Sequence, residues 1–182
     1  MKPLFTVHAG EYLVGSYIEQ HFRRVNVWVP ARDTGVDLLA SDRRNRRVVS
    51  LQVKFSKDFL PTHMGPIFQK RLRACGWWTI DRDKLRKSSA DFWVFALHGF
   101  ASRAPDFIIV PPKQLWRRLH SIHGSHKIIQ TYLWVTERGQ CWETRGLGRE
   151  DQRRIADGEY RDPRRDLTEW LSNWTPIARI NR

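Results

Sequence analysis

Cysteine is scarce in this chain, whose 182 residues include two, Cys75 and Cys141. They match no metal-ligand spacing and form no disulfide framework, which favours a reducing compartment. Long apolar runs are also missing: about 18 consecutive apolar residues are needed to span a membrane, and the first residues lack an apolar segment of signal-peptide length. We therefore expect a soluble, cytoplasmic protein with neither a membrane span nor a secretion signal.

Acidic residues are few relative to basic ones. The chain has 19 Asp and Glu against 32 Lys and Arg, so its formal net charge is +13 and its isoelectric point is near 10.5. The excess is spread over the chain, which is typical of proteins that bind a polyanion, and nucleic acid is the expected partner. The alternative is an ordinary solvated basic surface. No long basic amphipathic helix supports binding to an anionic membrane.

Several nucleotide and metal motifs are absent. No G-x-x-x-x-G-K-[ST] sequence occurs, so we expect no ATP-driven motor, and the Gly146-Leu147-Gly148 segment lacks the third glycine of a dinucleotide loop. His120, His123 and His126 are spaced by three residues, but the Gly-Ser pair at 124–125 interrupts a helix there. A surface loop is favoured over a zinc site at these histidines.

The most informative stretch is residues 35–55, which we predict to be a β-hairpin. Two runs rich in β-branched and apolar residues, 36–40 and 48–55, flank a charged connection at 42–47. Side chains alternate along a strand, so the second run places Val53 on the core face and Gln52 and Lys54 on the other. A hairpin symmetric about Arg44 and Asn45 pairs Asp37 with Gln52.

This pairing predicts a site for a divalent cation and a phosphate group. Asp37 and the side-chain carbonyl of Gln52 would lie roughly 5 Å apart, and both are oxygen donors that Mg²⁺ accepts. Lys54, two residues along the same face, would offset charge on a phosphoryl group or orient the attacking water. Asp33 is a rival carboxylate, but it occupies a turn in which Asp commonly binds the local backbone.

A helix is predicted over residues 10–22, where apolar residues recur at helical spacing. Glu11 falls in the same angular sector as Val14 and Ile18, so its carboxylate leans toward the interior. The alternative is that Glu11 only favours the positive end of the helix dipole.

The pattern G-x-D followed by Q-x-K, preceded by A-G-E-Y-L-V-G, resembles the signature of the PD-(D/E)xK (restriction endonuclease-like) nuclease superfamily, in the glutamine variant of Mrr-like endonucleases. The resemblance covers about the first hundred residues. It implies an α/β fold with an α-β-β-β-α-β core, in which helices flank a mixed central sheet. It also implies a metal-dependent nuclease, with DNA a more expected substrate than RNA. Gln52 departs from the usual carboxylate and lowers the site's negative charge.

The resemblance also implies residue roles. Mg²⁺, or Mn²⁺ in its place, would be held by Asp37, Gln52, the Val53 backbone carbonyl and Glu11, with Lys54 beside the attacking water. Enzymes of this fold that cut both strands commonly dimerise, which leaves a homodimer open. The basic residues expected to contact nucleic acid, unless they are only solvated, are Arg43, Arg44, Arg46, Arg47, Lys57, Lys70 and Arg71. The alternatives are an inactive nucleic-acid-binding module of the same fold and a basic structural protein with an accidental motif.

We expect one domain, residues 1–182, with a core at about 8–120 and a C-terminal extension at about 121–182. Tryptophans are expected to pack in the core rather than stack on bases. Further strands are predicted at 25–29, 92–97 and 107–110, helices at 83–89 and 113–119, and a loop at 57–73. A C-terminal hairpin, 128–135 with 140–143, should extend the sheet. Residues 147–165 should be irregular, followed by a short helix at 166–172.

Overall fold

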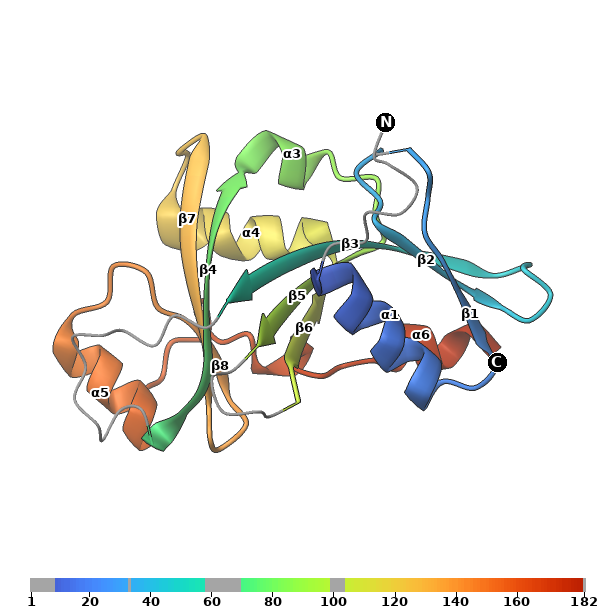
Figure 1. Cartoon of the computed structure of the whole chain (residues 1–182). Coiled ribbons are helices and arrows are strands. Elements are labelled where there is room, and N and C mark those ends of the chain that lie inside the picture. The colour runs from blue at the N-terminus through green and yellow to red at the C-terminus, as the bar shows by residue number, and fades with distance from the viewer. Residues whose placement is uncertain (1–8, 33, 58–69, 99–103, 182) are drawn as a thin grey trace.

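A computed structural model describes residues 9–32, 34–57, 70–98 and 104–181 of the chain. They form an α/β structure with two β-sheets and flanking helices (Figure 1). Within these ranges, no helix is long and apolar enough to cross a membrane.

The first sheet is mixed, as predicted, and has five strands. In chain order they are β1 (Val25–Trp28), β2 (Leu38–Asp42), β3 (Val48–Lys57), β5 (Phe92–His98) and β6 (Asp106–Val110). Their order across the sheet is β1-β2-β3-β5-β6. Strands β3 and β5 pair in parallel, whereas the other neighbours are antiparallel.

The predicted hairpin register is confirmed over residues 38–41 of β2, but the ladder begins at Leu38, so the expected pair of Asp37 with Gln52 is not part of it. Leu38 pairs with Leu51, and Ala40 pairs with Val49, as symmetry about Arg44 and Asn45 requires. Asn45 has a φ of 55°, a left-handed conformation that Asn adopts more readily than most residues. The turn is closed by a hydrogen bond from the Asn45 backbone N–H to the Asp42 carbonyl, at 3.0 Å.

Helix α1 (Ala9–His21) covers one face of the first sheet. Val14 and Ile18 are fully buried there in a cluster that includes Leu51 and Val53 of β3. The chain's last described elements, α6 (Thr175–Ala178) and the 3₁₀ turn η2 (Arg179–Asn181), contribute to the same cluster. This face of β3 is therefore closed by apolar packing.

The second sheet corrects the sequence-based topology. It has three antiparallel strands in the order β4-β7-β8: β4 (Leu72–Asp81), β7 (Ile128–Thr136) and β8 (Cys141–Glu143). The predicted C-terminal hairpin exists, but it pairs with β4 rather than extending the first sheet. Strand β4 was not predicted. Of the loop expected at 57–73, the part at 58–69 lies outside the described residues. Gly76 leaves room within β4 for the Trp78 ring, since a Cβ there would lie 2.2 Å from it.

The two sheets share a core on the face of the first sheet opposite α1. Phe95 of β5 and Leu133 of β7 are buried in one cluster with Leu115 and Leu119 of α4 (Pro112–His123). Helix α3 (Arg82–Arg86) lies beside α4, with Leu85 in the same cluster. Both helices were predicted, but α4 runs through His123 and so carries His120 and His123 on a helix rather than in a loop.

Helix α5 (Arg149–Asp157) covers part of the outer face of the second sheet. Its Ile155 packs with Cys75 of β4 and Trp134 of β7. The prediction of an irregular segment at 147–165 was wrong here, because two buried residues, Ile155 and Ala156, are too few to produce a helical period. Gly158 ends the helix at a φ of 78°. The expected short helix near 166–172 is a 3₁₀ turn, η1 (Thr168–Trp170).

Candidate active site

Asp37 lies at the point where β2 begins to pair with β3. Its backbone N–H donates to the Leu51 carbonyl at 2.8 Å, and its Oδ2 accepts a hydrogen bond from the Val53 backbone N–H, also at 2.8 Å. Backbone groups two residues apart on a strand point to the same side. Because β2 begins only at Leu38, the Asp37 carboxylate takes the place that a partner-strand carbonyl would occupy.

This contact places the carboxylate at the centre of the Q-x-K segment, because Val53 lies between Gln52 and Lys54. The N–H and C=O of one strand residue point to the same side in an antiparallel ladder. The Val53 carbonyl therefore projects toward the same side of β3 as Asp37. A hydrogen bond from a backbone N–H to a carboxylate is charge-assisted, so it orients the side chain firmly.

Gln52 and Lys54 point to the face opposite α1. They pair in register with Trp93 and Phe95 of β5, whose side chains belong to the core shared with the second sheet. The Lys54 Nζ lies 5.0 Å from the centroid of the Trp93 ring, a cation–π distance. The buried indole is itself held by a hydrogen bond from its Nε1 to the Ser88 Oγ, at 2.9 Å. Trp93 therefore positions the half-buried lysine.

Glu11 is buried with 5% of its surface exposed, so the prediction that it leans inward is confirmed. The adjacent Gly10 packs directly on β3: a Cβ at that position would lie 2.6 Å from the Phe55 Cβ and 3.2 Å from the Val53 Cγ1. The turn that carries Glu11 therefore lies against the same segment of β3 that binds Asp37. It approaches from the face opposite Gln52 and Lys54.

Of the predicted catalytic residues, Gln52 and Lys54 lie on β3, Asp37 binds the backbone of Val53 between them, and Glu11 lies on the α1 turn that packs on the same segment through Gly10. Their donor set is two carboxylates, one amide carbonyl and one backbone carbonyl. Over the described ranges, no group of three or more His, Cys, Asp or Glu side chains could hold a metal ion. A metal here would depend on the amide and the backbone carbonyl, both acceptable to Mg²⁺.

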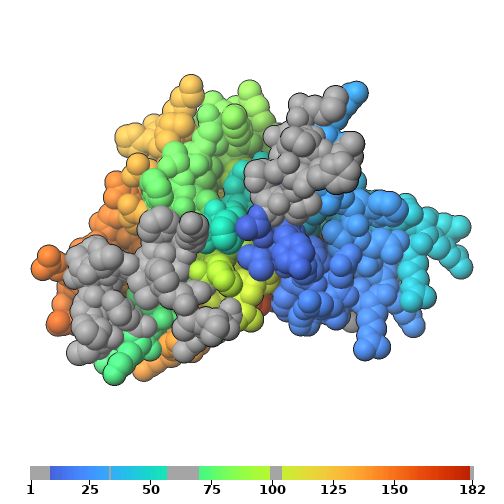
Figure 2. All heavy atoms as spheres, viewed as in Figure 1, coloured from blue at the N-terminus to red at the C-terminus, as the bar shows by residue number. Residues whose placement is uncertain are grey.

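The surface around this segment is visible in Figure 2. Teal atoms of β3 reach the surface between the dark blue atoms of α1 and the green atoms of the β4 and α3 region. The end of β3 is therefore accessible from solvent in this view.

The predicted nucleic-acid contacts do not gather at this segment. Arg43, Arg44, Arg46 and Arg47 are exposed in the hairpin turn, at the opposite end of β2 from Asp37. Arg43 and Arg44 lie six and seven residues from Asp37 along the chain, at roughly 3.3 Å per residue. They could bind a phosphate backbone only at some distance from Asp37.

The other three basic positions lie after β3. Lys70 is exposed, Arg71 forms an ion pair with Asp157 of α5, and the side chain of Lys57 lies outside the described residues. The roles of these positions remain predictions.

Sequence reasoning missed a buried ionic cluster around Glu143, which has no exposed surface. Its carboxylate accepts hydrogen bonds from Arg165 Nη1 at 2.5 Å and from Thr131 Oγ1 at 3.3 Å, and lies 3.1 Å from His123 Nε2. The cluster ties the second sheet to α4 and to the C-terminal segment. No local signal predicts it, because the partners are far apart in sequence.

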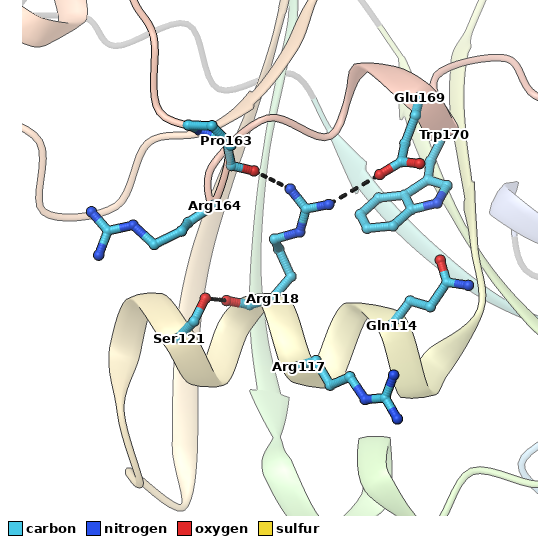
Figure 3. A pocket seen from close by; sticks show the side chains of 8 residues that line it. All are labelled: Gln114, Arg117, Arg118, Ser121, Pro163, Arg164, Glu169 and Trp170. Atoms are coloured by element: carbon cyan, nitrogen blue, oxygen red, sulfur yellow. Dashed lines mark hydrogen bonds and ion pairs between the residues drawn. The ribbon is translucent and has the colours of Figure 1, made fainter.

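Sequence reasoning also missed a basic pocket of about 420 Å³ between α4 and the C-terminal segment (Figure 3). Arg118 is anchored there by Pro163, by Glu169 and by the Trp170 ring, 5.0 Å away. Arg164, which also lines the pocket, binds Asp162 and lowers the pKa of that carboxyl through its side-chain hydrogen bond. Two of the three arginines that line the pocket are thus already paired with acidic side chains.

Comparison of the chain with protein-family models, with curated proteins and with solved structures finds no match.

Proposed function

We propose that this protein is a metal-dependent nuclease with a restriction endonuclease-like core, and that it hydrolyses phosphodiester bonds in DNA. The observation that carries the proposal is the 2.8 Å hydrogen bond between the Asp37 carboxylate and the backbone of Val53. It brings the aspartate of G-x-D to the middle residue of Q-x-K.

The topology supports the same proposal. Helix α1, the antiparallel strands β1, β2 and β3, helix α3 and the parallel strand β5 follow in the order α-β-β-β-α-β. Strand β4 is inserted between β3 and α3 and belongs to the second sheet.

The residues around this segment of β3 fit Mg²⁺, since Asp37, Gln52 and the Val53 carbonyl offer hard oxygen donors. Glu11 would add a second carboxylate from α1. Bound Mg²⁺ supplies Lewis acidity toward the phosphate oxygens. The net charge of +13 attracts the polyanionic substrate to the protein.

The residues around this segment of β3 have distinct roles in the proposed mechanism. The Val53 N–H holds the Asp37 carboxylate in one orientation, so little reorganisation is needed when the substrate binds. Trp93 restrains the Lys54 ammonium, which offsets the negative charge that develops on the transferring phosphoryl group. Gly10 allows the α1 turn to approach β3 closely and so places Glu11.

A noncatalytic nucleic-acid-binding module is the second candidate. Two observations favour it: the amide at position 52, where the superfamily usually has a carboxylate, and the cation–π contact that engages Lys54. In that case Lys54 would serve packing and phosphate binding without any chemistry.

Cleavage assays on labelled DNA and RNA distinguish the two candidates. Wild-type protein, Lys54→Ala and Asp37→Asn are compared in Mg²⁺, in Mn²⁺ and in chelator, with binding measured in parallel over a salt series. The matched control is Lys113→Ala, which removes one positive charge from an exposed position on α4. We expect metal-dependent cleavage that both site variants abolish and the control retains.

The outcomes separate clearly. Cleavage that survives Lys54→Ala and Asp37→Asn would refute the assigned site. Salt-dependent binding without cleavage of any substrate would support the binding module instead.

A further inference from the structure

Among the described residues, helix α5 covers only part of the outer face of the second sheet, the face that points away from the first sheet. Helix α5 closes it over Cys75 and Trp134, which are buried with Ile155. Along the same face of the strands, Trp77 has 39% of its surface exposed, and Thr79 and Gln130 are also exposed. An exposed sheet surface therefore continues beyond the helix.

Two aromatic rings and a guanidinium group meet on this exposed surface. Trp77 of β4 pairs in register with Tyr132 of β7, and their ring centroids lie 6.4 Å apart at an interplanar angle of 46°. The Arg145 guanidinium lies 5.3 Å from the Tyr132 ring centroid. Arg145 follows β8 and is exposed, so the cation borders the aromatic pair on the solvent side.

This aromatic platform, which we define as Trp77, Tyr132 and Arg145, is carried in part by β4, whose backbone contacts the strand of the candidate active site. The Trp77 backbone N–H donates to the Ser56 Oγ of β3 at 3.1 Å. Ser56 lies two residues after Lys54, about 7 Å along the strand. Strand β4 at Trp77 is therefore in direct contact with the strand that carries Gln52 and Lys54.

We infer that the aromatic platform binds unpaired nucleotides of a single-stranded segment that continues from the cleavage site past the edge of β4. Bases in a duplex are stacked on each other, whereas unpaired bases can stack on aromatic rings and on arginine planes. The adjacent arginine and the net charge of +13 complement a phosphate backbone. The inference rests on the proposed function for its substrate class and adds that the substrate contains a single-stranded portion.

Binding of labelled oligonucleotides in chelator tests the platform without cleavage. A single strand of about 16 nucleotides and a blunt duplex are titrated by fluorescence anisotropy with wild-type protein, Trp77→Ala, Trp77→Phe and Arg145→Ala. Trp28→Ala is the matched control, because Trp28 is 49% exposed on β1 of the first sheet. Thermal melts establish that each variant is folded.

We expect Trp77→Ala to weaken single-strand binding by about five- to a hundredfold, the range for loss of one stacked base. Arg145→Ala should weaken it less, whereas Trp77→Phe and Trp28→Ala should stay near wild type. Duplex affinity should change little in every variant.

Equal single-strand affinity for Trp77→Ala and Trp28→Ala would overturn the platform. A wild-type dimer that Trp77→Ala converts to monomer would also overturn it, because a second copy would then occupy the surface. Loss of cleavage in Lys54→Ala is measured in a separate assay, because it tests the nuclease proposal and not the aromatic platform. If single-strand binding depends on Trp77 but no metal supports cleavage, the platform stands and the nuclease proposal fails.

Discussion

Replacing Gln52 with Glu tests whether Asp37 and Gln52 form one metal site. If the β2–β3 register is extended by one residue beyond the Leu38–Leu51 pair, position 52 lies opposite Asp37 and a carboxylate there would lie about 5 Å from that of Asp37. Two unit charges at that distance repel by about 1 kcal/mol at the dielectric constant of water and by about 3 kcal/mol at an effective value of 20. Without metal, the free energy of unfolding of Gln52→Glu should therefore fall by about 1–3 kcal/mol.

Magnesium should reverse this loss, because the added charge strengthens cation binding. Stabilisation by a ligand grows as RT ln(1 + [L]/Kd), so Mg²⁺ should raise the stability of Gln52→Glu more steeply than that of wild type. Urea unfolding in chelator and over a Mg²⁺ series measures both effects. The Mg²⁺ concentration that gives half-maximal cleavage should fall in parallel.

Gln20→Glu is the control, since Gln20 is exposed near the end of α1 and the charge change is the same. The reasoning is refuted if the two variants lose equal stability in chelator and respond equally to Mg²⁺. That result would mean that position 52 and Asp37 do not share a cation.

Three further predictions concern packing and burial. Gly10→Ala should lower the free energy of unfolding by about 1–3 kcal/mol through overpacking against Val53 and Phe55. Gly15→Ala is the control and should not lower it, because the nearest contact of its added Cβ lies at 3.7 Å; equal urea midpoints for the two variants would contradict the prediction. Glu143→Gln should cost about 3–5 kcal/mol by removing the buried carboxylate that the Arg165 Nη1 binds at 2.5 Å, which leaves Arg165 only the longer ion pair with Asp162; the exposed Glu159→Gln should change stability little. Burial raises the pKa of the Cys141 thiol far above its ordinary 9.0, so the unfolded chain loses this proton at a lower pH than the folded chain does. The free energy of unfolding should therefore fall as pH rises above about 9, by up to about 1.4 kcal/mol per pH unit. Cys141→Ala should flatten that decline in thermal melts, and an unchanged decline would exclude the thiol as its cause.

The hairpin and its register could be predicted from the sequence because they depend on local features. Two β-branched runs flank a polar turn, and strand alternation then determines which side chains share a face. The same reasoning assigns Gln52 and Lys54 to one face and buries Glu11 with the apolar stripe of α1. Each inference uses residues within about twenty positions of one another.

The second sheet could not be predicted in this way. Strand β4 pairs with β7, about fifty residues later in the chain, and no local pattern indicates whether the β7–β8 hairpin joins β6 or β4. Helix α5 escaped prediction because its two buried residues produce no period and its stability depends on Cys75 and Trp134 beneath it.

The sequence by itself determined the chemistry available near β3: an aspartate, a glutamine, a lysine and a buried glutamate on elements of predictable type. Only the tertiary structure decided what surrounds them. The parallel pairing of β3 with β5 places Trp93 beneath Lys54, and the contact with Ser56 places β4, which carries Trp77 of the aromatic platform, beside the same strand. The physical reason is that strand alternation and helical periodicity act over neighbouring residues, whereas pairing between distant strands depends on burial of the whole core.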